Sequence, residues 1–296
     1  MFDFDFHSPV EVLHHELFEQ KKCTVYVKRD DLIHPFISGN KWRKLKYTLQ
    51  RASELHKKHL ITFGGAWSNH LLATAAAAAK FGFRVTAYVR GDQVENPNLQ
   101  LCRLFGMQLV FIDRTAYRDR SHLFKKNHAH DEQAFFIDEG GMSDTALLGC
   151  AEIIASLTES YDHLFCACGT GTTIAGLAMG LAQQRLQTQL HGVPVLKGAD
   201  FLWDHIHHLL ADHTVQLTLH TDYHFGGYAK TKPALLDFIA DFVPRTGLLI
   251  EPVYTGKLFY CLTDLIAKDY FAPKSRILLL HSGGIAGILG QLDRFS

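Results

Sequence analysis

The sequence lacks an excess of charge of either sign. Lys and Arg together number 30, Asp and Glu number 30, and the chain has 296 residues. A dedicated nucleic-acid-binding protein usually carries a basic excess, so this balance argues against that class. No apolar run approaches the roughly 18 residues that cross a bilayer. The first residues, "MFDFDFHSPVEV", are acidic and aromatic, unlike a secretory signal. We therefore expect neither a nucleic-acid nor a membrane partner.

Cysteine pairs with the spacing of a redox or metal motif are also missing. The six cysteines include no C-x-x-C motif, and "CAC" at 166–168 alternates as a strand does. We interpret these residues as small buried core thiols rather than as a redox or metal site. Reduced thiols without a secretory signal predict a cytoplasmic protein.

Metal-ligand spacing is absent too, although the chain has 19 histidines. The densest clusters are "LHHE" at 13–16 and "DHIHHLL" at 204–210. Neither matches H-E-x-x-H, and no Cys/His set has zinc-ligand spacing. We interpret both clusters as solvated helix faces and predict no metal.

Apolar β-rich runs alternate with segments of helical period along most of the chain. This alternation predicts parallel sheets covered by helices on both faces. About nine strands exceed what one compact sheet uses, so we expect an α/β protein with two three-layer αβα domains. We place the larger domain at 1–44 and 144–296 and the smaller, inserted one at 45–143. Expected strands lie at 24–28, 59–63, 83–89, 108–112, 134–138, 163–169, 190–196, 215–220 and 276–282, and expected helices at 68–81, 145–157 and 172–184.

Ligands of such sheets bind where strands lead into helices, and the stretch "SGNKWRKLKY" at 38–47 is one such place. Ser38 or Asn40 can cap a helix that starts near Lys41. Lys41 and Lys44 then share one face, about 5–6 Å apart. One amine can bind an aldehyde while the other meets an anion, as pyridoxal phosphate requires; the alternative is a solvated cationic face.

Three further junctions carry candidate ligand groups. In "TFGGAWSNH", Ser68 caps an alanine-rich helix whose free N–H groups suit a carboxylate. In "CGTGTT", glycines let the backbone approach a phosphate, and hydroxyls can bind its oxygens. The loop is no Walker A motif and lacks the third glycine of G-x-G-x-x-G. The strand end "LLLHSGG" opens onto Ser282.

Taken together and in this order, the motifs resemble the 1-aminocyclopropane-1-carboxylate (ACC) deaminase / D-cysteine desulfhydrase family, within the tryptophan-synthase-β-like fold-type II pyridoxal-phosphate enzymes. The resemblance runs from about Val25 to Gly290. It implies pyridoxal 5'-phosphate bound between the two domains, an amino-acid substrate and a homodimer. The motifs are "KRDDL…SGNKWRKLKY", "GGAWSNH", "EGGMSDTALLGCAE", "CGTGTTIAGL", "GGYAK", "EPVYTGK" and "HSGG".

The resemblance also implies roles for individual residues. Lys41 corresponds to the lysine that carries the cofactor, and Asn69 to the asparagine on its ring hydroxyl. Ser68 corresponds to a serine near the substrate carboxylate, and Tyr254 and Tyr228 to active-site tyrosines. We expect His70 and Trp67 beside the substrate as well, with Trp67 narrowing its pocket. The phosphate cup would comprise Lys44, Gly169, Thr170, Gly171, Thr172 and Thr173.

Two positions bear on the substrate. In ACC deaminases a glutamate close to the pyridine nitrogen follows the tyrosine of "PVY"; here Thr255 stands there. D-Cysteine desulfhydrases have a hydroxyl residue where this chain has Ser282. A neutral Thr255 makes the ring a weaker electron sink, which suits β-elimination better than ring opening. We therefore expect D-cysteine desulfhydrase-like elimination to pyruvate, ammonia and sulfide.

Four alternatives stay open at this point. The first is ACC deamination, and the second is action on another D- or β-substituted amino acid. The third is isomerisation of an amino acid on the same cofactor. The fourth is a catalytically inactive protein that keeps the cofactor. Within "SGNKWRKLKY", Arg43 and Lys46 lie off the shared lysine face, and we expect both to be ordinary surface cations.

Overall fold

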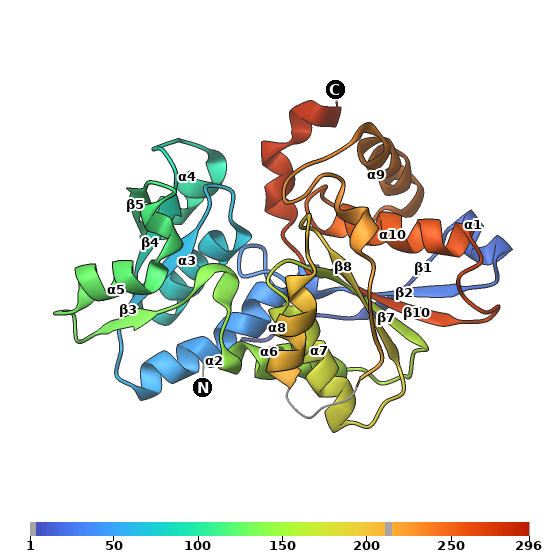
Figure 1. The fold of residues 1–296 in the computed structure, drawn as a ribbon, viewed down its shortest axis with the longest axis horizontal. Coiled ribbons are helices and arrows are strands. Elements are labelled where there is room, and N and C mark those ends of the chain that lie inside the picture. The colour runs from blue at the N-terminus through green and yellow to red at the C-terminus, as the bar shows by residue number, and fades with distance from the viewer. Residues whose placement is uncertain (1–3, 211–214, 296) are drawn as a thin grey trace.

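The computed structural model describes residues 4–210 and 215–295, apart from the side chains of 205, 207–210 and 286. Figure 1 shows two lobes, each built around one sheet. The six-stranded sheet has the order β1-β2-β10-β7-β8-β9. Its strands are β1 (Val10–Leu13), β2 (Thr24–Lys28), β7 (His163–Cys168), β8 (Gln189–Pro194), β9 (Leu217–Leu219) and β10 (Arg276–Leu280).

The four-stranded sheet has the order β5-β4-β3-β6, and all its neighbours pair in parallel. Its strands are β3 (His59–Gly64), β4 (Arg84–Arg90), β5 (Gln108–Ile112) and β6 (Ala134–Phe136). The α-helices are α1 (Glu16–Gln20), α2 (Asn40–Glu54), α3 (Asn69–Phe81), α4 (Pro97–Leu104), α5 (Arg120–His128), α6 (Asp144–Ala155), α7 (Thr172–Gln183), α8 (Phe201–Leu210), α9 (Pro233–Thr246) and α10 (Thr255–Ala267).

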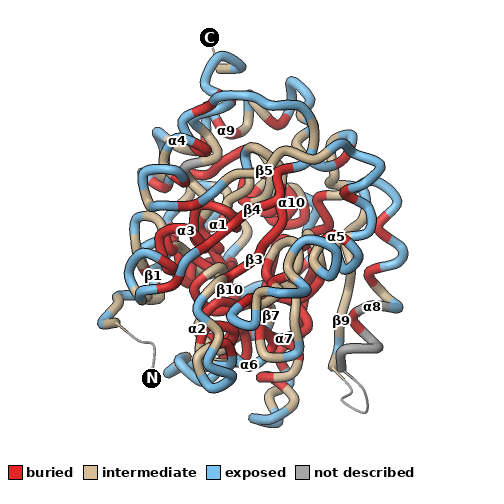
Figure 2. The backbone as a smooth tube through the Cα atoms, turned by 90° about the vertical axis from the view of Figure 1, so that its left-hand side faces the viewer, coloured by how far each residue is buried: buried red, intermediate tan, exposed pale blue. Residues whose placement is uncertain are grey.

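Helices cover both faces of each sheet, because successive strand residues point to opposite sides. On β10, Ile277 and Leu279 join the core under α1, α9 and α10, whereas Leu278 and Leu280 join the core under α6, α7 and α8. On β3, Leu60 packs toward α2, α3 and α4, and its neighbour Ile61 packs toward α5. In Figure 2 the central strands, β3 and β4 among them, are mostly buried. The predicted three-layer αβα class is confirmed.

All nine predicted strands are present, with ends that differ by up to two residues. Strand β1 was not predicted; it pairs with β2 in the only antiparallel contact of the described sheets. Its residues Val10 to Leu13 alternate weakly and only Leu13 is buried, so the strand has little hydrophobic signal.

Helix α2 links the two halves of the chain. Trp42, Leu45 and Leu49 pack in the core of the smaller sheet. On another side, α6 crosses so closely that a Cβ at Gly149 would lie 1.8 Å from the carbonyl oxygen of Arg43. The strands of the smaller sheet fall within the predicted domain 45–143, while the division at residue 44, inside this helix, stays a prediction.

Two expectations about α2 are wrong. Gly39, not Ser38 or Asn40, is its N-cap, and no side chain caps the helix there. Arg43 is no surface cation: it is 4% exposed and its guanidinium binds the buried carboxylate of Asp30. Lys46 is half-buried and pairs with Glu152 at 3.1 Å.

Candidate active site

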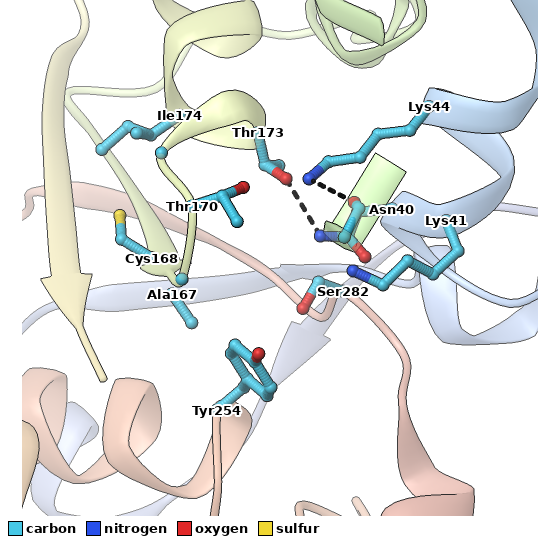
Figure 3. A pocket seen from close by; sticks show the side chains of 13 residues that line it. Asn40, Lys41, Lys44, Ala167, Cys168, Thr170, Thr173, Ile174, Tyr254 and Ser282 are labelled. Carbon is cyan, nitrogen blue, oxygen red and sulfur yellow. Dashed lines mark hydrogen bonds between the residues drawn. The ribbon is translucent and has the colours of Figure 1, made fainter. Parts of the chain in front are cut away.

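A cavity with about 420 Å³ of empty space, part of it open to solvent, lies beyond the carboxyl ends of β7 and β10. Figure 3 shows the amines of Lys41 and Lys44 pointing into it from α2, with Tyr254 and Ser282 below them. Its lining comprises Asn40, Lys41, Lys44, Gly140, Ala167, Cys168, Gly169, Thr170, Gly171, Thr173, Ile174, Tyr254 and Ser282.

A close approach of two backbones brings α2 to this place. Gly39 has a φ of +62°, and a Cβ on it would lie 1.7 Å from the carbonyl oxygen of Ser282. Only glycine fits there, both sterically and in conformation. The backbone N–H of Asn40 donates to that same carbonyl oxygen at 3.2 Å. The side-chain amide of Asn40 donates to the hydroxyl of Thr173 at 2.9 Å. The predicted helix-capping side chain therefore binds the opposite loop instead.

The two lysines differ in their surroundings. Burial, followed by the charge of Lys44, lowers the pKa of Lys41 to about 7. No acceptor in the described residues binds the Lys41 amine. Lys44 is 3% exposed, and burial lowers its pKa as well. The Lys44 amine donates to the carbonyl of Gly140 at 3.3 Å. At neutral pH a substantial part of the Lys41 amines is uncharged and nucleophilic.

The loop 169–173 has the form of an anion cradle. Gly171, with a φ of +84°, is the N-cap of the twelve-residue helix α7 and offers no side-chain cap. The first N–H groups of the helix are therefore free to bind an anion. Thr170 and Thr172 lie with their hydroxyls 3.1 Å apart. A phosphate fits these donors together with the Lys44 amine, which has one protein acceptor.

Two tyrosines adjoin the cradle. Tyr254 lines the cavity, and its ring would be 3.3 Å from a Cβ on Gly169. Tyr228 is 45% exposed and its ring meets that of Tyr254 edge-on, with centroids 6.0 Å apart. Burial is the main cause that raises the pKa of both phenols, and the neighbouring Tyr228 further raises that of Tyr254. Both remain neutral hydrogen-bond donors at neutral pH.

Thr255 is fully buried and does not line the cavity. Its hydroxyl accepts from the backbone of Glu251 at 2.8 Å. The Glu251 carboxylate in turn accepts from the N–H groups of Val253, Tyr254 and Thr255 at 2.7–2.8 Å. Thr255 thus helps to hold the start of α10, on which Tyr254 is placed.

The candidate residues of the smaller domain lie beside the cavity rather than in its lining. Ser68 caps α3, as predicted, by accepting from Leu71. The side chain of Asn69 lies against the backbone of Gly284, two residues beyond Ser282. His70 is 2% exposed and binds Thr62, and burial holds its pKa well below the ordinary value.

Trp67 also lies outside the lining. Its indole is 40% exposed and rests on the backbone of Gly290, where a Cβ would meet it at 2.8 Å. The indole thus contacts the segment η5 (Ile285–Gly290).

Five residues at or near the site were not predicted. Gly140, Ala167, Cys168 and Ile174 line the cavity, and Glu251 organises the start of α10. The "EGG" at 139–141 precedes a predicted helix and could have indicated Gly140. Cys168 lies near the end of a predicted strand that leads into the glycine-rich loop. The burial of a carboxylate at 251 leaves no sequence signal apart from its place just before a helix.

Among the residues that the structure describes, no histidine lines the cavity. His14 is exposed and His15 caps α1, while the histidine side chains of 204–210 lie outside the described residues. Within the described part of the chain, His59, His128 and Asp131 form a group that could hold a metal ion, and none of them lines the cavity. Nδ1 of His59 and a carboxylate oxygen of Asp131 lie 2.6 Å apart, at hydrogen-bond distance. No described helix has both the length and the apolar character needed to cross a membrane.

Fold and cavity define a class: an α/β enzyme with an amine and an anion cradle at the carboxyl ends of a parallel sheet. Residues 6–283 match the model of the family "Pyridoxal-phosphate dependent enzyme", and the chain belongs to this family. A crystal structure described as an ACC deaminase homologue has a TM-score of 0.88 and 27% identity; the match covers 98% of this chain and 93% of that one.

Two curated relatives span most of the chain. A protein of Thermotoga maritima, provisionally named an ACC deaminase, is 30% identical over 97% of this chain and 96% of its own length. A D-cysteine desulfhydrase of Yersinia enterocolitica is also 30% identical, over 88% and 86%. The predicted family is thereby confirmed.

Proposed function

We propose that the protein is a pyridoxal-phosphate-dependent lyase that releases pyruvate, ammonia and sulfide from D-cysteine or a closely related β-substituted amino acid. The observation that carries the proposal is the arrangement of Lys41, with its lowered pKa, one helical turn from Lys44 and beside the free N-terminus of α7. This arrangement matches an aldehyde and a phosphate on one small molecule. We place the cofactor between the two domains.

When bound, pyridoxal phosphate supplies an aldehyde for the amine and a ring that accepts electrons from Cα. Lys44, Gly169, Thr170, Gly171, Thr172 and Thr173 hold the phosphate. Lys41 would hold the aldehyde, and its amine is the group that would take the proton from Cα of the substrate. A lysine of pKa about 7 suits both tasks, since it is easily deprotonated and readily protonated again.

The remaining candidates orient the reactants. Tyr254 lies over the cavity and donates to the ring or to the departing sulfur, and Tyr228 supports it from the solvent side. Ser282 would offer a neutral hydroxyl to the pyridine nitrogen, and Thr255 keeps the start of α10 in place. Asn69 would bind the ring hydroxyl. The substrate side of the site is formed or supported by Ser68, His70 and Trp67. The imidazole of His70 is neutral there. In the net reaction, D-cysteine and water give pyruvate, ammonia and hydrogen sulfide.

ACC deamination is the second candidate. The names of the Thermotoga relative and of the similar crystal structure favour it. Against it stands the neutral Thr255, whose side chain turns to Glu251. Following keto acid, ammonia and sulfide from a panel of D- and L-amino acids separates the two. We expect pyruvate and sulfide from D-cysteine; 2-oxobutyrate from ACC, with no sulfide from D-cysteine, would reverse the assignment.

Covalent attachment tests the role of Lys41. Borohydride reduction of the holoprotein should fix the cofactor on the peptide that contains Lys41, as read by mass spectrometry. Lys41→Ala should lose this adduct, the visible absorbance of the bound cofactor and turnover. Lys46→Ala, on the same helix but paired with Glu152, is the matched control and should keep all three. An adduct on another lysine would refute the assignment.

We also propose that the protein is a cytoplasmic homodimer. The cytoplasmic location is supported by six cysteines that are all buried and unpaired, and the dimer by the family resemblance. Light scattering on the purified holoprotein and fractionation of the source cells test these two points.

A further inference from the structure

Lys257 is a buried cation outside the cavity lining. It lies on α10, close after Tyr254, and its side chain is fully buried. Its amine donates to the carbonyl oxygens of His224 and Gly227, each at 2.8 Å, and to that of Val195 at 3.4 Å. An ammonium group has three N–H donors. Here all three point at backbone carbonyls.

The carbonyls belong to a strained loop. Between 224 and 230, positive φ angles occur at Phe225 (+50°), Gly226 (+99°), Gly227 (+117°) and Ala229 (+54°). Two of these residues are not glycine, so the conformation is unfavourable unless surrounding contacts impose it. Strain of this kind gathers at functional sites, where a side chain must be held in one place. Tyr228 lies in the middle of this loop.

A carbonyl cage around a positive charge resembles the sites that proteins build for potassium or ammonium ions. In this chain the cation is part of the helix that carries Tyr254. Burial lowers the pKa of Lys257 to about 8, and the charge of Glu251 opposes the shift. At neutral pH the group keeps most of its charge, although it is removed from water.

We infer that Lys257 is a positioning residue, a cation built into the chain that fixes the loop 224–230 and thereby holds Tyr228 beside Tyr254. Val195 directly follows β8, so the same ammonium ties together the sheet, the loop and the first turn of α10. The part that concerns turnover rests on the proposed function. The part that concerns the loop does not.

The experiment replaces the built-in cation by a free one. Lys257→Ala leaves the three carbonyls around a space that a potassium or ammonium ion can enter, whereas Lys257→Met fills it with apolar atoms. Activity is measured on the holoprotein in potassium, ammonium and tetramethylammonium chloride at equal ionic strength. Lys268→Met, at the C-cap of the same helix but exposed and paired with Asp264, is the matched control.

In tetramethylammonium chloride we expect Lys257→Ala and Lys257→Met to lose about 10- to 100-fold in kcat, as is typical for residues that orient a functional group. Potassium or ammonium should restore a large part in Lys257→Ala and none in Lys257→Met. The wild type and Lys268→Met should not respond. In a Tyr228→Phe background the loss from Lys257→Ala should shrink, because the two residues act through one route.

Two further readouts do not depend on turnover. Potassium should raise the Tm of Lys257→Ala but not that of the wild type, and it should slow proteolysis within 224–230. If the wild type turns over no amino acid, the proposed function fails while these readouts still test Lys257. An unchanged kcat in Lys257→Ala, equal Tm values in all three salts, or an undiminished loss in the Tyr228→Phe background would overturn the inference.

Discussion

Neighbouring residues of α2 have opposite electrostatic surroundings. Arg43 is buried against Asp30, whose carboxylate also accepts from the hydroxyl of Ser8 at 2.6 Å. Lys44, next in the chain, is equally buried but has only a carbonyl acceptor. The first cation is fully paired and structural, whereas the second is left able to bind an anion. The sequence placed the two cations on different faces of the helix but wrongly predicted Arg43 to be a surface cation, because the position of the Asp30 carboxylate cannot be read from the sequence.

Removing the Arg43 guanidinium from its pair with Asp30 should destabilise the protein. Arg43→Met leaves the carboxylate of Asp30 buried without its cation, and we expect the free energy of unfolding to fall by about 3–5 kcal/mol. Urea denaturation of the apoprotein measures it. The double variant Asp30→Asn/Arg43→Met should recover part of the loss. Lys46→Met is the comparison, with an expected change below about 1 kcal/mol; equal losses in both single variants would contradict the interpretation.

At the scale of elements, the larger sheet carries a row of three histidines across adjacent strands. His163 on β7 contacts His191 on β8, and His191 contacts His220 just after β9; both nitrogen–nitrogen distances are 3.0 Å. The His191 ring also stacks on Phe165. Burial, followed by the charges of His220 and His163, lowers the pKa of His191 from 6.5 to about 3. The row is stable with neutral rings.

Acid should therefore destabilise the protein through this row. Because the folded pKa of His191 is below its unfolded value, the unfolded chain binds the proton first as the pH falls. The contribution of the neutral His191 ring to the free energy of unfolding is complete above pH 6.5 and is lost between pH 6.5 and about 3. In this range the free energy of unfolding falls by about 1.4 kcal/mol per pH unit for one proton. Urea denaturation at a series of pH values measures the slope. His191→Gln should flatten it, and exposed His14→Gln should not.

The sequence predicted the elements well where hydrophobic period and turn residues agree. The strands at 59–64 and 276–280 and the helix capped by Ser68 are examples. The prediction failed where a contact between residues distant in sequence decides the local structure. Gly39 replaces the predicted side-chain cap because the backbone at Ser282 comes too close for any other residue. The prediction also failed at Thr255, whose hydroxyl binds Glu251 four residues earlier instead of lining the cavity.

At the scale of the whole molecule, a contact joins the smaller domain to the C-terminal part of the larger one. Trp67 precedes Ser68 and Asn69 and rests on Gly290. Gly290→Ala places a Cβ 2.8 Å from the indole, so the indole and its loop must shift. We expect kcat/KM to fall about tenfold, since small displacements of site residues are costly. Gly287→Ala, whose Cβ would meet Asn69 at an ordinary 3.6 Å, is the control and should stay near wild type.

The thermal unfolding midpoint distinguishes a local effect from general damage. Because Trp67 and Gly290 lie at the surface, the Tm of Gly290→Ala should remain close to that of the wild type. A fall in Tm that parallels the loss of kcat/KM would show that the contact stabilises the fold rather than the site.

Helix α2 has a consequence for the order of assembly during synthesis. Its apolar side is packed in the core of the smaller sheet, yet its lysines face a loop that the ribosome adds more than 120 residues later. Ser282, which closes against Gly39, comes later still. If the cofactor binds at the proposed site, neither half of the chain can hold it alone. Loading would then wait until nearly all of the chain has left the ribosome, so the cofactor would report on completed folding and would not nucleate it.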